Sequence, residues 1–382
     1  MIRSVAMTRD SEFSLGATRR LVNDLFEPRP AVYWLDFLGS LVLGVACFWT
    51  VRRWPLFVPA GWALMLSPLA FAVSVLAIYR AANFTHELVH LRDKRFLPFR
   101  IAWNLLCGIP LLMPSFTYHT HVRHHVRRMY GTHEDGEYLA LAAGPRWKIL
   151  AYLCEPFVLP LLAVMRFGLL TPLCWLSLRV RHWAYRHASS MVIDPQFMRP
   201  LPTRGELKVW RLQEAATFGS LVGAAALLAW GRLPPGFLPQ AYATSVCVLL
   251  LNHVRTLGAH RYVHHREEVS FLDQLLDSVN YPRHLWTAEL WAPVGLRYHA
   301  LHHLFPSLPY HHLGAAHRRL MEQLPADSPY RQTESPSLCA SLRRLWRQAG
   351  EPTSPPERLA LPGGRMANNA RLGRRESAAV KS

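Results

Sequence analysis

Four apolar runs constrain this chain most, because each is long enough to cross a lipid bilayer and they fall into two pairs. The first pair covers residues 35–51 and 54–79, and the second covers residues 214–231 and 237–254. A helix needs about 20 mostly apolar residues to span the hydrocarbon. Within it, backbone polar groups must be satisfied by the helix itself. The sequence therefore predicts an all-α integral membrane protein with four transmembrane helices in two hairpins.

Two other apolar stretches are harder to interpret. Residues 101–115 are apolar but short and contain two prolines, so we expect them to lie at the membrane interface or to re-enter it. Residues 149–179 are longer, but they carry Glu155, Arg166 and several prolines. This second stretch is compatible either with interfacial helices or with up to two further spans.

The composition favours a lipid partner over a nucleic-acid partner. Hydrophobic residues make up 51% of the chain and charged residues only 18%, whereas soluble domains carry about 25% charged residues. The net charge is +18, which suits either nucleic acid or anionic lipid. The basic residues lie between the apolar runs and in the tails, not in one stripe with interleaved aromatics. We therefore expect contact with the bilayer and no nucleic-acid partner.

The distribution of basic residues predicts the orientation. Short loops rich in Lys and Arg stay in the cytoplasm, and such residues precede the first span and follow spans two and four, while the two hairpin loops carry few. Both termini are thus expected in the cytoplasm, and we expect the membrane to be a bacterial inner membrane. We divide the chain into a cytoplasmic segment (1–34), a membrane domain (35–320) and a basic, disordered tail (321–382).

Histidines are concentrated in three clusters with helical spacing. The clusters have the sequences HELVH (86–90), HVRHH (121–125) and HALHH (299–303). Residues three and four apart share a helix face, so each cluster can aim its imidazoles at one point. Eight ligands are too many for one tetrahedral zinc ion and suit a pair of metal ions, although imidazole alone does not select iron, zinc or copper. The eight residues are His86, His90, His121, His124, His125, His299, His302 and His303.

The first cluster also matches H-E-x-x-H, the zinc-protease motif. In that interpretation Glu87 would be the general base. A membrane metalloprotease would need one further ligand and would leave the second and third clusters without a role. A protease is therefore a weaker hypothesis than a two-metal centre just outside the membrane.

Longer motifs around the clusters carry a family resemblance. Residues 295–310 read GLRYHALHHLFPSLPY, residues 132–138 read THEDGEY and residues 255–262 read RTLGAHRY. These segments, in this order around two hairpins, resemble the membrane fatty acid desaturase superfamily. The resemblance covers roughly residues 35–320.

The resemblance implies a non-haem di-iron centre with nine histidine ligands and O₂ as co-substrate. The ninth ligand would be His260. The implied reaction is desaturation of a fatty acyl chain carried by a lipid, coenzyme A or acyl carrier protein. Hydroxylation or ketolation of an alkyl or carotenoid-like chain on the same scaffold stays open. Residues 361–364 read LPGG, without the histidine of a fused haem domain, so we expect a separate electron donor such as a ferredoxin-type protein or a small cytochrome.

Charged residues near the clusters are candidates for supporting roles. Carboxylates usually hold metal-binding imidazoles in place, although each could instead pair with an arginine. Arginines could receive the phosphate or carboxylate head group of a substrate, or could contact lipid. The carboxylate candidates are Glu87, Asp135, Glu137, Asp273 and Asp277, and the arginine candidates are Arg127, Arg128, Arg261 and Arg297.

Overall fold

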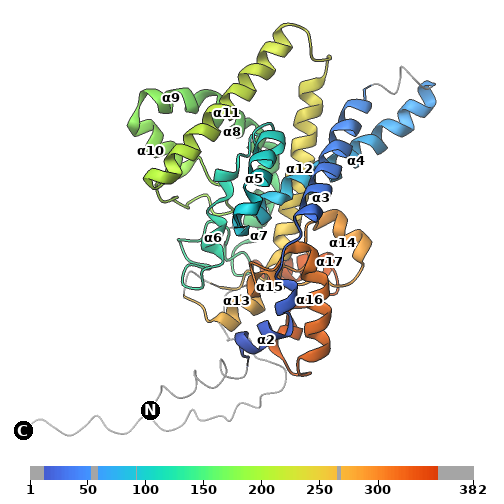
Figure 1. Cartoon of the computed structure of the whole chain (residues 1–382), viewed down its shortest axis with the longest axis vertical. Helices are drawn as coiled ribbons and strands as arrows, with labels where there is room; N and C mark the ends of the chain where they lie inside the picture. The colour runs from blue at the N-terminus through green and yellow to red at the C-terminus, as the bar shows by residue number, and fades with distance from the viewer. Residues whose placement is uncertain (1–12, 53–58, 92, 265–267, 352–382) are drawn as a thin grey trace, which may run out of the picture.

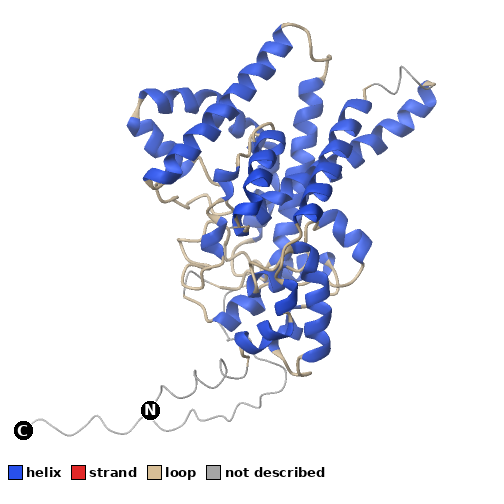
Figure 2. Ribbon diagram, in the orientation of Figure 1, coloured by secondary structure: helices blue, strands red, loops and turns tan. Residues whose placement is uncertain are grey.

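The described part of the computed structural model is helical throughout. It covers residues 13–52, 59–91, 93–264 and 268–351, and it contains no strand in these ranges (Figure 2). The extended pairing there is limited to isolated bridges such as that between His260 and Ser278. The prediction of an all-α protein is confirmed.

The first hairpin consists of α3 (Pro30–Thr50) and α4 (Ala60–His90). The two helices pack closely at Gly44, where a Cβ atom would lie 2.8 Å from a side-chain carbon of Ile78. At 1.5 Å per residue, the 31 residues of α4 extend about 46 Å, whereas the hydrocarbon core is about 30 Å thick. One end of α4 can therefore project from the membrane, and His86 and His90 lie in its last two turns.

The second hairpin consists of α11 (Arg204–Ala229) and α12 (Phe237–Ala259). A capping box between Thr203 and Glu206 starts α11. α12 packs against α4, so the C-terminal ends of these two helices, away from the hairpin loops, come together (Figure 1). α12 stops at Ala259, the residue before His260.

Within the described residues, five helical segments, not four, are long and apolar enough to cross a membrane. The additional one is Leu159–Leu176, which lies in the stretch that the sequence left open. It is built from α8 (Leu159–Val164), the π-helical η7 (Met165–Leu170) and α9 (Thr171–Leu176). Its internal charge is tolerated because Arg166 is buried in an ion pair with Glu214 of α11.

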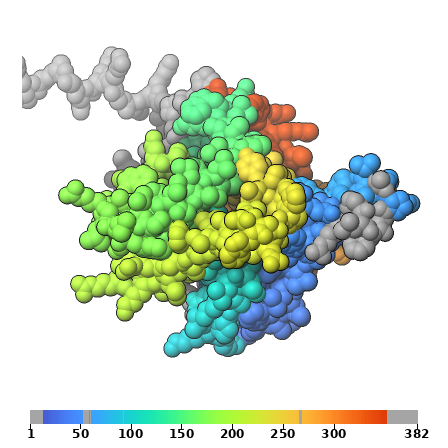
Figure 3. All heavy atoms as spheres, turned by 90° about the horizontal axis from the view of Figure 1, so that it is seen from above, coloured from blue at the N-terminus to red at the C-terminus, as the bar shows by residue number. Residues whose placement is uncertain are grey.

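The candidate spans expose apolar side chains, as lipid-facing helices do. Leu64 of α4 is 76% exposed and Leu176 at the end of α9 is 86% exposed. Seen from above, the α3–α4 hairpin (blue) and the segment that includes α8 to α10 (green) lie on opposite sides of the second hairpin (Figure 3). The segment 97–108 forms α5 (Leu97–Trp103) and η4 (Asn104–Gly108), which together are too short to span.

Short helices gather at the end of the molecule opposite the hairpin loops (Figure 1). The short helices of the described residues are α2 (Leu15–Leu21), η1 (Asn23–Leu25), η3 (Lys94–Phe96), η5 (Ser115–Tyr118), α6 (His121–His124), α7 (Arg146–Cys154), η6 (Glu155–Phe157), α10 (Leu178–His187), α13 (Phe271–Asp277), α14 (Leu285–Trp291), α15 (His299–Leu304), α16 (Tyr310–Gln323), η8 (Pro329–Thr333) and α17 (Leu338–Gln348). We call the region that includes α2, α6, α13, α15, α16 and α17 the short-helix end. Aromatic packing joins it to the first hairpin, because the Tyr33 ring lies 5.0 Å from both the Phe96 and the Tyr310 rings.

The prediction of a disordered tail is wrong for residues 321–351. These residues complete α16 and form η8 and α17. α17 folds because Leu338, Leu342 and Leu345 recur at helical spacing and form an apolar face that packs against α12. The high arginine content of the segment hid this pattern. Residues 352–382, including the LPGG sequence, lie outside the described residues.

Candidate metal centre

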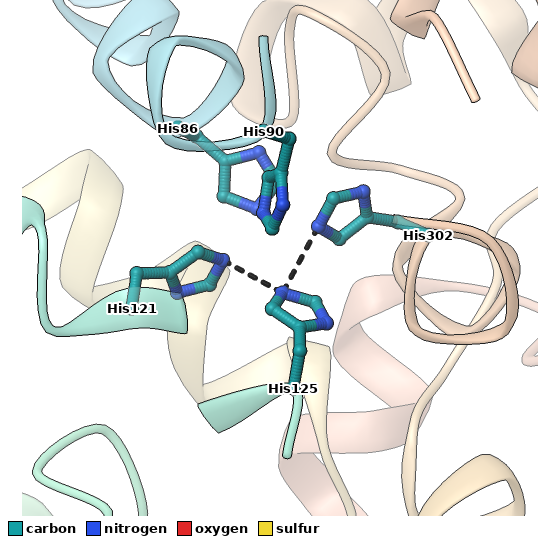
Figure 4. A group of neighbouring side chains, drawn as sticks. All are labelled: His86, His90, His121, His125 and His302. Carbon is teal, nitrogen blue, oxygen red and sulfur yellow. Dashed lines mark hydrogen bonds between the residues drawn. The ribbon is translucent and has the colours of Figure 1, made fainter. Parts of the chain in front are cut away.

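The nine predicted histidines come together as two neighbouring groups. Within each group the potential ligand atoms all lie within 4.8 Å of one another. The five-histidine group is shown in Figure 4, where its imidazoles point toward a common centre. The five-histidine group is His86, His90, His121, His125 and His302, and the four-histidine group is His124, His260, His299 and His303.

Each H-x-x-H-H cluster divides between the two groups, which differs from our expectation that all three of its imidazoles share one point. His121 and His125 belong to the five-histidine group, whereas His124 belongs to the other. Adjacent residues on a helix point about 100° apart, and residues three apart still differ in direction by about 60°, whereas residues four apart differ by only about 40°. In the third cluster, His299 and His303 pair in the same way and His302 faces the other group. One short helix can thus serve two metal ions.

The four-histidine group has the donor set of a metal site. The Nε2 atom of His260 lies 3.0 Å from that of His124 and 2.8 Å from that of His299. The Nε2 of His299 lies 3.1 Å from that of His303. A neutral imidazole nitrogen carries either one proton or one lone pair, so a nitrogen that faces two others cannot form a good hydrogen bond with both. A cation among the lone pairs would satisfy all four rings.

The five-histidine group shows the same signs. The Nε2 of His125 lies 2.9 Å from that of His121 and 3.1 Å from that of His302. Both ring nitrogens of the buried His86 have no hydrogen-bond partner among the described residues. Buried polar groups are rarely left without a partner, so these residues also fit a bound metal ion.

Three of the five candidate carboxylates contact histidines of the two groups. The Nδ1 of His124 lies 2.8 Å from Asp135, and the Nδ1 of His121 lies 2.8 Å from Glu137. A carboxylate accepts the Nδ1 proton, which leaves the Nε2 lone pair for a metal ion. This arrangement is typical of metal-binding histidines.

Asp277 supports His260 through a small network. The carboxylate lies 3.4 Å from the Nδ1 of His260 and accepts a 2.5 Å hydrogen bond from the Tyr130 hydroxyl. That hydroxyl also lies 2.9 Å from the same Nδ1. Tyr130 and Asp277 are both fully buried, so the ring of His260 is fixed in orientation.

The electrostatics favour neutral imidazoles and a cation nearby, except at His124, where burial lowers the pKa but nearby carboxylates, chiefly Asp135, raise it by more. Burial lowers the pKa of His302 and His303 well below the usual value, and neighbouring histidines lower it further. Burial lowers the pKa of His260 to about 4. Neutral imidazole is the form that binds metal. Burial also raises the pKa of Glu137 to about 8, and a bound cation would counter that shift and keep this carboxylate ionised.

The other two carboxylates have different roles. Glu87 is buried and accepts a 2.9 Å hydrogen bond from the Tyr33 hydroxyl, while its second oxygen lies 3.9 Å from the Nδ1 of His86. Its engagement with Tyr33 does not suit the general base of a protease. The prediction for Asp273 is wrong, because this carboxylate accepts hydrogen bonds from the backbone and hydroxyl of Ser270 and caps α13.

The candidate head-group arginines differ in exposure, since Arg297 is buried, Arg261 is half-buried and the other two are exposed. The prediction for Arg297 is wrong, because its fully buried guanidinium donates to the carbonyl oxygens of Tyr281 and Pro282 and holds the loop before α15. The side chain of Arg261 donates to the carbonyl oxygen of Gln332. Arg127 and Arg128, which follow the second cluster, are exposed, and their role as head-group ligands stays a prediction.

Tyr118 was missed in the sequence, although its hydroxyl lies 3.2 Å from the Nδ1 of His121, and so were two residues that support the four-histidine group. One is Tyr130, described above. The other is Gln274, whose amide nitrogen lies 3.4 Å from the Nδ1 of His303 and donates to the carbonyl oxygen of His124. A usable signal was the position of Gln274, three residues before Asp277 and therefore on the same face of α13.

The chain is similar to known proteins over most of its length. Residues 60–334 match the family described as fatty acid desaturase. The chain is also 37% identical over 329 residues to a protein named ceramide hydroxylase from Caulobacter vibrioides (strain NA1000 / CB15N). That similarity covers 86% of this chain and 92% of the relative.

Proposed function

Because this chain belongs to the fatty acid desaturase family, we propose that it oxidises an unactivated C–H bond of a membrane lipid with O₂ at a di-iron centre. Hydroxylation of a ceramide or a chemically similar lipid is the outcome best supported. The observation that carries this choice is the 37% identity, over 86% of the chain, to a protein named ceramide hydroxylase.

The histidines, the carboxylates that contact them and the burial of the site have separate roles in the proposed reaction. The nine histidines would hold two iron ions, and these would supply the oxidising power for C–H cleavage, which no acid, base or nucleophile of the protein possesses. Asp135, Glu137 and Asp277 hold the imidazoles in the tautomer that leaves Nε2 free. The burial of the site excludes bulk water from the reacting carbon.

Desaturation of an acyl chain is the second candidate, since the matching family bears that name. Both reactions consume one O₂, two electrons and two protons. Hydroxylation inserts one oxygen atom and releases one water, whereas desaturation removes two hydrogens from neighbouring carbons and releases two waters. The same ligand set serves both, so the position of the chain relative to the irons decides the outcome.

Lipid analysis of a ceramide-producing bacterial host tests this choice. Expression of the wild-type chain under ¹⁸O₂ is expected to yield a lipid that has gained one labelled oxygen atom, detected by mass spectrometry. The His302→Ala variant, produced at the same level, should yield none. A new double bond without oxygen incorporation would replace hydroxylation by desaturation. An oxygenated carotenoid-like product would instead support the hydroxylase or ketolase alternative for that substrate class.

Metal content tests the metalloprotease alternative. That alternative assigns a role only to His86 and His90 of the nine clustered histidines. We expect about two irons per purified chain. A single zinc ion that is required for peptide cleavage would contradict the proposed oxygenase.

Electron supply and orientation form the remaining part of the proposal. We place both termini and the short-helix end in the cytoplasm, where a separate ferredoxin-type protein or small cytochrome could deliver electrons to the positively charged surface. Reporter fusions to the C-terminus test the orientation, because alkaline phosphatase is inactive in the cytoplasm. Strong phosphatase activity of that fusion would reverse the orientation.

A further inference from the structure

An apolar groove lies away from the nine histidines, between α7, α12 and α17. It encloses a cavity of about 350 Å³. Leu153 of α7, Val254 and Leu257 of α12, and Leu342 of α17 contribute to its lining. Of these side chains only Leu257 is fully buried, so the other three leave apolar surface open to an incoming chain.

The groove lies where the candidate spans end. Leu257 is two residues before the end of α12, and α7 leads through η6 into the candidate span Leu159–Leu176. Two tryptophans flank it on the surface: Trp147 is 63% exposed and Trp346 is 40% exposed. Exposed tryptophans are enriched at the boundary between hydrocarbon and head groups. The groove therefore opens at the level of the lipid head groups.

The rim of the groove is positively charged. Arg343 and Arg347 lie four residues apart on α17, so they share one helix face, and both line the groove. Both are exposed, and neither forms an ion pair with another described residue. α17 has no acidic residue. An apolar cavity whose mouth carries two guanidinium groups, neither of them ion-paired within the described residues, is complementary to an acyl chain with a phosphate at its end.

The groove is held in shape before any ligand binds. The Nε of Arg146 donates a 3.0 Å hydrogen bond to the carbonyl oxygen of Trp346, and its guanidinium lies 5.4 Å from the Trp346 ring centroid. The backbone nitrogen of Gly350 donates to the carbonyl oxygen of Gly144. These contacts tie the end of α17 to the start of α7. Because the groove is preformed, little conformational entropy is lost when a ligand binds in it.

We propose that this groove binds an anionic glycerophospholipid of the surrounding bilayer. One acyl chain occupies the apolar cavity, and the phosphate lies between Arg343 and Arg347. The site is separate from the metal centre, so its occupancy does not depend on bound iron or on the reaction that the protein catalyses.

Lipid binding to the purified full-length chain tests the charge requirement. Native mass spectrometry in detergent would measure binding of phosphatidylglycerol and phosphatidylcholine. The wild type is expected to prefer phosphatidylglycerol. The Arg343→Gln/Arg347→Gln variant should bind it roughly tenfold or more weakly, since each basic residue near a membrane surface contributes about a fivefold factor. Phosphatidylcholine binding should change little.

A matched control uses another basic helix. Arg179 and Arg186 of α10 are also exposed, and neither lines this groove. The Arg179→Gln/Arg186→Gln variant removes the same charge and should keep wild-type binding. Equal binding of the two lipids by the wild type, or an equal loss in this control, would overturn the proposal in favour of non-specific attraction.

Filling the cavity tests the acyl chain. Val254→Trp is expected to weaken binding of both lipids at unchanged iron content. Leu342→Trp serves the same purpose if Val254→Trp does not fold. Undiminished phosphatidylglycerol binding by a folded groove-filling variant would overturn the proposed chain position.

Discussion

The two histidine groups of the metal centre differ in burial and in support. All four members of the four-histidine group are buried, and Asp135, Asp277 and Tyr130 contact its rings. In the five-histidine group His90 and His125 are only half-buried. One carboxylate, Glu137, and one hydroxyl, that of Tyr118, form close contacts with a ring of that group, and both contacts are to the Nδ1 of His121.

The difference reflects which elements build each group. The four-histidine group is formed by α6, α15 and the residue after α12, with α13 behind it, so most of it comes from the short-helix end. The five-histidine group takes two ligands from α4 of the first hairpin. We infer that the four-histidine group holds its metal more tightly, and that the five-histidine group is the more accessible side.

The largest effect is expected from removing one ligand of each group. His299→Ala should lose most of the iron, because the better-supported site fails, whereas His302→Ala should keep about one iron per chain. Both should lower activity more than about 100-fold, since loss of a supporting contact alone costs about 10–100-fold. Elemental analysis and product formation measure this. His311→Ala, outside both groups, should keep two irons, and equal iron loss in the two ligand variants would contradict the comparison.

A smaller effect is expected from Asp277→Asn. This change removes the charge that supports His260 and should weaken binding of one metal ion by roughly 100-fold, the upper end for such contacts. Titration with a competing chelator measures it. Asp273→Asn, on the same helix, is the matched control: it should cost about 1 kcal/mol of stability through the lost helix cap but leave metal affinity unchanged. Equal affinities of the two variants would rule out a special role for Asp277.

Glu137→Gln should have a weaker effect, on the other metal ion. The carboxylate supports His121 but is 15% exposed, so water can partly replace it. We expect metal affinity of the five-histidine group to fall roughly tenfold, in the same chelator titration. A loss as large as that of Asp277→Asn would show that the two groups are supported equally.

The smallest effect is expected from Tyr130→Phe. It removes one hydroxyl that donates to Asp277 but leaves the carboxylate in place. A hydrogen bond to a charged group contributes about 1.5–3 kcal/mol, so a lower melting temperature and a modest loss of metal affinity should follow. Tyr152→Phe, in the same aromatic cluster, should leave metal affinity as in the wild type, because its ring stacks on His253, outside both histidine groups. The role assigned to Tyr130 fails if both variants bind metal equally.

Much of the metal centre was predictable because its chemistry is encoded in short, local patterns. Helical spacing marks His86 and His90 as neighbours without any knowledge of the fold, and all nine predicted histidines lie in the two groups. Apolar runs predicted both hairpins for a similar reason, since bilayer thickness sets their length. Asp135 and Glu137 could be predicted for the same reason, because they follow the second cluster closely in the sequence.

The other features of the site depend on long-range packing, because the sequence alone does not show which distant residue a side chain will contact. Asp273 and Asp277 look alike in the sequence, yet one caps α13 and the other reaches His260. The sequence suggested that Arg297 could bind a head group, but in the structure the surrounding loop encloses its guanidinium. The tail segment 338–348 needed the surface of α12 to fold. The division of the histidines into two groups arises in the same way, because it requires the ends of α4 and α12 to meet the short helices between them.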